Sequence, residues 1–311
     1  MPRRFAAAAL FSLFLPLLSP AQQPTLRVET HLVTETFTVR DARGLLVPDL
    51  GRDDFALTED GMPQTIRLFA RQADLPLSLV LVVDASESQN KFLKPHLRDI
   101  QAFLAGVLRP QDQVSILGFG NHLRLVVNGA SQPAAIIAAL EQYDKHPSDF
   151  PELDPDDTRE GGSAVYDAIV AAAGRLGGSP GRSRAILLFS DGEENASAHD
   201  ELDAIAAAQD ADALVYAIRY TAAKHDRLTA EERQGATALR HMAAQTGGVD
   251  YDALHADLPQ VFTQIAAELR SLYALGYYST FRQRDGSFRK VVIATRRPGL
   301  TLRARAGYYA R

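Results

Sequence analysis

The chain contains no cysteine. This absence excludes disulfides, thiolate zinc sites, iron–sulfur clusters and cysteine nucleophiles, so any metal must be held by oxygen atoms or imidazole. A G-x-x-x-x-G-K-[ST] phosphate loop is also missing, and the eight histidines form no H-E-x-x-H pair. The sequence therefore gives no support to a nucleotide-hydrolysing enzyme or a zinc protease.

A strong excess of one charge is missing as well, because 33 Lys and Arg stand against 38 Asp and Glu in 311 residues, a net charge of −5. The residues from Phe281 onward differ, with nine basic residues and one acidic one. This segment could bind an anionic polymer, or its strands could direct their charges to solvent and to the acidic remainder of the same chain. We favour the second interpretation and expect no nucleic-acid partner.

Long apolar runs are limited to the N-terminus, where Arg3 and Arg4 precede an apolar stretch from Phe5 to Leu18 and the small residues of Ser19-Pro20-Ala21. This order is typical of a cleavable signal peptide, and the run is too short for a membrane helix. We expect residues 1–21 to be removed near Ala21. The mature protein is then exported, to the periplasm or the outside of the cell, with no transmembrane segment.

What the sequence does contain is an ordinary globular composition, with 46% hydrophobic and 23% charged residues. Residues 22–76 alternate polar and apolar side chains, as antiparallel strands do, and so do residues 272–311, where we expect one final strand near 301–309. Between them, residues 77–271 alternate aliphatic runs with helical periods, which predicts a doubly wound, mainly parallel sheet. We expect an α/β fold flanked by one small β-sandwich-like subdomain built from both terminal segments.

Three loops at the carboxyl ends of the predicted parallel strands contain short polar side chains. Asp84, Ser86 and Ser88 follow the first aliphatic run, Asp191 follows a later one, and Ser163 lies on a glycine loop before a helix. Ligands of such sheets bind at this edge, and carboxylate and hydroxyl oxygens suit a hard cation. We therefore predict a metal site from these five residues. The acidic stretch 149–160 lacks the spacing of an EF-hand and is interpreted as a solvated loop.

These motifs, D-x-S-x-S, G-G-S and S-D-G in this order, resemble the metal-ion-dependent adhesion site of von Willebrand factor type A domains. The resemblance implies that Ser86, Ser88 and Ser163 bind Mg²⁺ or Mn²⁺ directly, with Ca²⁺ as an alternative. It implies that Asp84 and Asp191 act mostly through water and that a partner's carboxylate completes the coordination. Ser163 replaces the family's usual threonine, and Glu87 replaces a small residue.

A narrower resemblance covers nearly the whole mature chain and involves exported bacterial proteins grouped as the von Willebrand factor A-related family named for Acidobacteria. It implies export and the same fold. The matching phrases are Val39-Arg40-Asp41, Val47-Pro48-Asp49-Leu50, Glu59-Asp60-Gly61, Leu275-Gly276-Tyr277-Tyr278, Asp285-Gly286-Ser287-Phe288-Arg289 and Gly307-Tyr308-Tyr309.

The preferred function is non-enzymatic recognition or adhesion, in which the cation binds an acidic residue of a protein ligand. One alternative is a structural assembly subunit with a degenerate metal site. Another, less favoured, is a hydrolase: Ser163 has Val165 where a nucleophile elbow needs glycine, and Asp84 starts no D-x-D motif. Because Asp84 ends a strand, we expect it to be exposed and its replacement by alanine to leave the fold intact.

Overall fold

The computed structural model describes residues 32–311 except 74, 121, 154–161, 179–180, 222–227, 282, 311 and the side chain of Asn90. Residues from 31 onward form one compact unit. In the described part of the chain, no helix is both long and apolar enough to cross a bilayer. The predicted signal peptide and most of the acidic stretch 149–160 lie outside the described residues and stay predictions.

A six-stranded sheet forms the centre of the α/β part, in the order β10-β9-β8-β5-β6-β7. All neighbours are parallel except β7, which is antiparallel to β6. Every residue of β5 is buried, because helices cover both faces of the sheet. The strands are β5 (Leu77–Asp84), β6 (Gln113–Phe119), β7 (Arg124–Ala130), β8 (Ser183–Ser190), β9 (Ala213–Arg219) and β10 (Asp250–Asp252).

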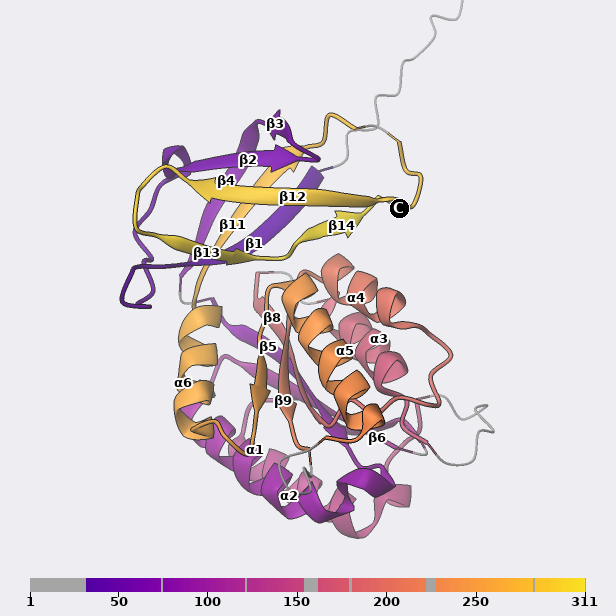
Figure 1. Cartoon of the computed structure of the whole chain (residues 1–311). Coiled ribbons are helices and arrows are strands. Elements are labelled where there is room, and N and C mark those ends of the chain that lie inside the picture. Colours follow the sequence, from indigo (N-terminus) through magenta and orange to yellow (C-terminus); the bar gives the residue numbers. More distant parts are fainter. Residues whose placement is uncertain are drawn as a thin grey trace, which may run out of the picture. The chain divides into compact units, whose positions relative to one another are not determined.

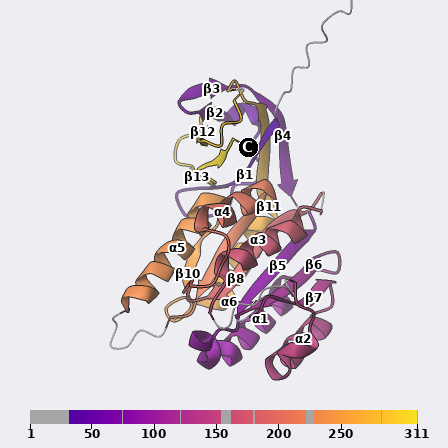
Figure 2. The same ribbon diagram turned by 90° about the vertical axis from the view of Figure 1, so that its right-hand side faces the viewer.

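Three helices pack on each face of this sheet (Figures 1 and 2). One face is covered by α1 (Leu93–Val107), α2 (Pro133–Lys145) and α6 (Leu258–Leu269). The other is covered by α3 (Val165–Leu176), α4 (Glu201–Asp210) and α5 (Ala230–Thr246). The predicted doubly wound α/β fold is therefore confirmed. Short 3₁₀ helices, which include η1 (Arg52–Asp54), η2 (Glu87–Phe92) and η3 (Pro147–Asp149), lie in the connections.

Strands from both ends of the chain pair in two antiparallel sheets, as the alternating patterns predicted. One has the order β13-β1-β11-β4 and the other β14-β12-β2-β3, and aromatic rings such as Phe37, Phe55 and Tyr273 fill the space between them. The strands are β1 (Leu32–Arg40), β2 (Phe55–Glu59), β3 (Met62–Gln64), β4 (Ile66–Ala73), β11 (Ser271–Tyr278), β12 (Phe288–Thr295), β13 (Thr301–Ala304) and β14 (Gly307–Tyr309). The boundaries 22–76, 77–271 and 272–311 stay a prediction.

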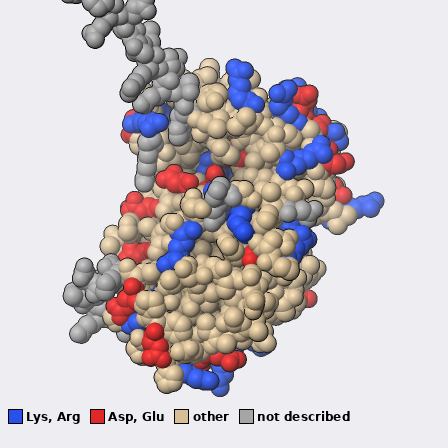
Figure 3. Space-filling view, turned by 180° about the vertical axis from the view of Figure 1, so that it is seen from behind, with Lys and Arg blue, Asp and Glu red and all other residues tan. Residues whose placement is uncertain are grey.

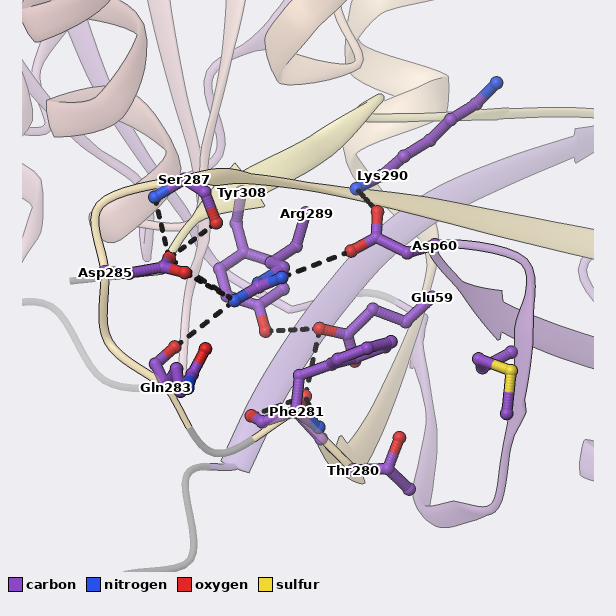
Figure 4. A network of polar contacts seen from close by, with 12 residues as sticks. Glu59, Asp60, Thr280, Phe281, Gln283, Asp285, Ser287, Arg289, Lys290 and Tyr308 are labelled. Carbon is purple, nitrogen blue, oxygen red and sulfur yellow. Dashed lines mark hydrogen bonds and ion pairs between the residues drawn. The ribbon is translucent and has the colours of Figure 1, made fainter.

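The basic C-terminal segment is paired largely with acidic residues of the same chain. Arg289 contacts Asp60 and Asp285 (Figure 4), and Arg297 contacts Asp54 at 2.7 Å. Acidic and basic side chains are mixed on the face shown in Figure 3. These contacts support the interpretation in which the tail neutralises its own protein.

Two further arginines of this segment bind buried carboxylates where the β-strands meet the helices. Arg305 contacts Glu35 at 2.9 Å and donates to the carbonyl of Gln209 in α4, and Arg303 pairs with Glu268 of α6. Glu35 and Glu268 are 0% and 1% exposed. We call these four residues (Glu35, Glu268, Arg303 and Arg305) the arginine junction.

Some elements were not predicted from the sequence. The helix α2 and the edge strand β7 were missed because much of each is exposed: only three of the 13 residues of α2 are buried, and β7 is buried only in its middle. The final segment was expected to be one strand near 301–309, but it forms two, β13 and β14, which belong to different sheets. That expectation was wrong because β13 pairs with β1 while β14 pairs with β12, so the chain changes sheets between them.

Candidate metal-binding site

Asp84 is the last residue of β5 and is completely buried. One carboxylate oxygen accepts the backbone N–H of Ser86 at 2.9 Å, and the other accepts the hydroxyl of Ser190 at 2.5 Å. Burial raises the pKa of Asp84 to about 7, although the hydrogen bonds from Ser190 and Ser86 oppose that shift. The expectation of an exposed Asp84 was wrong: its carboxylate ties the end of β5 to the end of β8, so its removal leaves buried donors unpaired.

Ser86 and Ser88 lie on the loop and the 3₁₀ turn that follow Asp84. Their hydroxyl oxygens are 3.2 Å apart, and both side chains line an open hollow of about 620 Å³ at this edge of the sheet. Ser86 is 7% exposed. The two hydroxyls therefore converge from one loop on one space.

Ser163 lines the same hollow from the glycine loop before α3. Its side chain is 4% exposed, and its hydroxyl has no hydrogen-bond partner among the described residues. The loop is fastened by Asn195, whose side-chain oxygen accepts the Ser163 N–H at 2.8 Å and whose own N–H donates to the Ser163 carbonyl at 3.1 Å. Gly162 has φ +114, and a Cβ there would lie 2.6 Å from that Asn195 oxygen, so this position requires glycine.

Asp191 follows β8 and is 4% exposed. Its carboxylate accepts the N–H of Glu193 at 3.0 Å and the side-chain amide of Gln89 at 2.6 Å. Gln89 is fully buried and also donates to the carbonyl of Tyr220. Like Asp84, Asp191 does not line the hollow. The structure thus brings the three predicted serines together on one hollow and places the two predicted aspartates behind them.

Several residues that hold this arrangement were missed by sequence reasoning. Gln89 fixes Asp191, and nothing in its sequence context distinguishes it from a surface glutamine. Asn195 and Ser197 match only a formal glycosylation sequon, yet Asn195 holds Ser163, and the Ser197 hydroxyl accepts the first N–H groups of α3 from Tyr166 and Asp167. The only signal that Asn195 and Ser197 share is their position a few residues after the S-D-G motif.

The donor set of the site matches a hard cation. It offers three hydroxyl oxygens on the hollow and two carboxylates behind them, which are the ligand types that Mg²⁺ and Mn²⁺ prefer. Among the described residues there is no group of three or more His, Cys, Asp or Glu side chains placed to hold a metal. A cation here would therefore depend on serine hydroxyls, and the unpartnered buried hydroxyl of Ser163 is the atom that such an ion would satisfy.

Charged side chains on the wall of the hollow are of both signs. Glu87 and Glu193 lie there together with His122 and Arg124. Arg124 is held by the carbonyl of Phe150 and by the carboxylate of Glu152, so its charge is already paired. Burial, with the neighbouring charge of Asp191, raises the pKa of Glu193. The wall thus offers no free arginine to bind an anion directly.

Comparison with known proteins finds a family match in the α/β part of the chain. Residues 79–194 match the model of the von Willebrand factor type A domain, whereas a search of curated proteins found no significant match. The match begins within β5 and ends just after the S-D-G motif. It therefore includes all five predicted site residues.

Solved structures with a similar fold include an aerotolerance-related membrane protein from Bacteroides fragilis (17% identity, 62% of this chain, 98% of that chain, TM-score 0.46). BatB from Bacteroides thetaiotaomicron is similar at 19% identity, covering 61% and 98%, with a TM-score of 0.45. Proximal thread matrix protein 1 from the mussel byssus has 14% identity, covering 68% and 51%, with a TM-score of 0.48. The sequence match is therefore the stronger of these findings: residues 79–194 of this chain are similar to the von Willebrand factor type A domain.

Proposed function

We propose that this chain is a non-enzymatic recognition module that binds a carboxylate of a protein partner through a divalent cation at Ser86, Ser88 and Ser163. The observation that supports this most directly is Ser163, whose buried hydroxyl has no partner in the described part of the chain and lines the same hollow as the two other serines. A buried polar group without a partner costs roughly 1–3 kcal/mol. A bound cation would remove that cost.

The charge of the site explains why the partner should supply a carboxylate. Three of the five ligating residues are neutral hydroxyls, and the carboxylates of Asp84 and Asp191 lie behind them, where they would act through water. An ion held in this way keeps much of its positive charge and is exposed on the hollow. Mg²⁺ or Mn²⁺ is the proposed ion, with Ca²⁺ as an alternative.

A hydrolytic function has less support from the same atoms. Among the described residues, no histidine is hydrogen-bonded to the hydroxyls of Ser86, Ser88 or Ser163, so none of them has the partner of an activated nucleophile. A subunit that only assembles, without metal, remains the competing proposal. It predicts no response to divalent cations.

Export belongs to the same proposal, since an adhesion module acts outside the cytoplasm. Its support is the signal-peptide pattern of residues 1–21. Mass spectrometry of the natively exported form should find Gln22 at or near the N-terminus. An intact Met1 in that fraction would contradict export by cleavage.

The test of the metal site is thermal unfolding with and without Mg²⁺ or Mn²⁺. An ion that binds only the folded state adds about 2.7 kcal/mol at 100 times its Kd, and the melting temperature rises accordingly. Ser163→Ala should abolish the rise, whereas Ser163→Thr should keep it. Ser148→Ala is the matched control, because Ser148 lines the same hollow without belonging to the ligand set.

A wild-type melting curve that does not change at millimolar Mg²⁺ and Mn²⁺ would favour the metal-free assembly subunit.

Where the metal does raise the melting temperature, Glu87→Gly tests the role of the acidic side chain on the wall, because Glu87 is exposed and lines the hollow. If its carboxylate competes for the open coordination position, the variant binds carboxylates more tightly. If it supports the ion, the variant needs more metal for the same rise.

A further inference from the structure

A second, smaller cavity of about 180 Å³ lies beside the serine hollow, between the end of β5 and the helices α1 and α2. Its wall is mostly aliphatic, with Leu97, Ile100 and Leu140 among the lining residues. Ala85, Tyr143 and Pro147 line both spaces. Because Ala85 stands between Asp84 and Ser86, the two cavities meet one residue from a proposed metal ligand.

His96 of α1 and Asp144 of α2 line this cavity with ionisable side chains. The His96 side chain is 1% exposed, and neither ring nitrogen has a hydrogen-bond partner among the described residues. The aromatic rings around it offer no such partner: Tyr220 packs edge-on at 4.3 Å, and its hydroxyl donates instead to Asp99. No described side chain binds either ring nitrogen, so the resonances of this imidazole should respond to whatever occupies the cavity.

Tyr143 forms the wall between the two spaces and is held firmly. A Cβ on Gly118 would lie 2.3 Å from the Tyr143 ring, so the ring rests directly on the backbone of β6 at a place where only glycine leaves room. Phe150 also packs edge-on against this ring, with ring centroids 5.6 Å apart. The Tyr143 ring is therefore held in place, and a ligand that occupies both spaces must pass around it.

We propose that one segment of the partner occupies both spaces, with its carboxylate at the serine hollow and a neighbouring branched aliphatic side chain in the cavity beside His96. This inference rests on the proposed function and adds the chemistry of the partner: an acidic residue close to a leucine-sized one. An aliphatic cavity of about 150 Å³ is known to take up benzene, so about 180 Å³ is enough for a four-carbon side chain. The shared wall at Ala85 favours a segment that spans both cavities over a separate small molecule.

The test uses small acids of increasing reach as probes. Acetate, 3-methylbutanoate, 4-methylpentanoate and 6-methylheptanoate are titrated into the ¹⁵N-labelled protein with Mg²⁺, and binding is followed by NMR. One of the branched acids should bind at least tenfold more tightly than acetate, because it adds aliphatic burial to the same carboxylate contact. The resonances of the His96 ring should shift with that acid and not with acetate.

Leu97→Trp should fill the cavity and reduce the affinity of the best branched acid to that of acetate. Leu254→Trp is the matched control, since Leu254 is 54% exposed and lines neither space, and it should change nothing. If Leu97→Trp does not fold, Leu93→Phe fills the same cavity with a smaller change.

The outcomes separate the two proposals. If acetate binds only with Mg²⁺ and the branched acids bind no more tightly, the two-cavity inference is overturned and the metal site stands. If no acid binds with Mg²⁺, the proposed function itself fails, and the inference fails with it. A gain that persists in Leu97→Trp would place the aliphatic group elsewhere and would also overturn the inference.

Discussion

Buried carboxylates are treated differently in two regions of this molecule. At the arginine junction, Glu35 is paired with Arg305 and Glu268 with Arg303, so charge meets charge. At the carboxyl edge of the sheet, Asp84 and Asp191 are held by hydroxyl, amide and backbone N–H groups, and the described residues include no ion-pair partner for either. Glu35 and Glu268 thus have positively charged partners, whereas the groups that hold Asp84 and Asp191 are neutral.

Under the proposed function, the carboxylates of Asp84 and Asp191 attract a cation because no positive charge of the protein is paired with them, while Asp84 also stabilises the fold through its bond to Ser190. An arginine beside Asp84 would stabilise the charge and remove the attraction for a metal ion. Neutral donors orient the two carboxylates without neutralising them. The following predictions test this contrast, beginning with the largest expected effect.

Deletion of residues 281–311 should damage the molecule most. It removes β12, β13, β14 and the arginines of the junction, so Glu35 loses its partner and the aromatic core around Phe37 and Phe55 is uncovered. We expect aggregation in size-exclusion chromatography, while the α/β segment 77–271 alone stays monomeric. A deletion variant that is monomeric with an unaltered melting temperature would show that the two terminal segments do not depend on each other.

Arg305→Leu tests the arginine junction by removing the charge of one of its two arginines. Glu35 is then a buried carboxylate without a counter-charge, and removing one partner of such a pair costs roughly 3–5 kcal/mol of unfolding free energy. Urea denaturation measures the loss. Arg296→Leu is the control, since Arg296 is exposed and its replacement should change stability by less than about 0.5 kcal/mol. Equal stability of the two variants would refute the role given to Arg305.

His96→Phe tests a buried side chain near the carboxyl end of β5 through the pH dependence of stability. Burial lowers the pKa of His96 from 6.5 to about 4, opposed by the charge of Asp99. Between these values the unfolded chain binds a proton that the folded chain does not, so stability falls as the pH falls from 6.5 to 4, by about 3 kcal/mol. Urea unfolding at several pH values should show a smaller acid loss in His96→Phe. The same acid dependence in both proteins would mean that His96 is solvated.

Asn195→Ala should have the smallest effect on the fold and a selective one on the site. It removes one hydrogen bond to the Ser163 N–H, worth about 1 kcal/mol. The metal-induced rise in melting temperature should shrink as well, because the Ser163 loop loses its fastening. Ser197→Ala is the comparison: it weakens the start of α3 and leaves the contact between Asn195 and Ser163 in place. If Asn195→Ala kept the full metal-induced rise in melting temperature, metal binding would not depend on the hydrogen bond between Asn195 and Ser163.

The features that the sequence predicted are those set by residues close together in the chain. The central strands were predictable because β5, β8 and β9 are buried on both faces and each contains a run of at least five consecutive apolar residues. The placement of the three serines and two aspartates at one edge of the sheet was predictable because the carboxyl ends of parallel strands share an edge, whereas their role in metal binding stays a prediction. Both signals are local in the chain.

Features that depend on distant partners were not predictable. Buried Asp84 accepts a hydrogen bond from Ser190, which is 106 residues away in the sequence. Gln89 donates to Asp191, which is 102 residues away. The edge strand β7 shows only partial burial, so its pattern is weak. A helix at α2 was missed although Pro133 stands in its first turn, because a proline there marks a helix start only when the apolar period that follows is clear.

The position of Asn195 has a practical consequence for producing this protein. Asn195-Ala196-Ser197 is an acceptor sequence for N-linked sugars, Asn195 is exposed, and it lines the serine hollow. A yeast or mammalian host that secretes the chain would attach an oligosaccharide to the amide nitrogen of this side chain, and the sugar would stand in the hollow beside Ser163. Material made in this way would fold and yet fail in every binding assay described above. Bacterial expression, or enzymatic removal of the sugar, is therefore part of the experimental design.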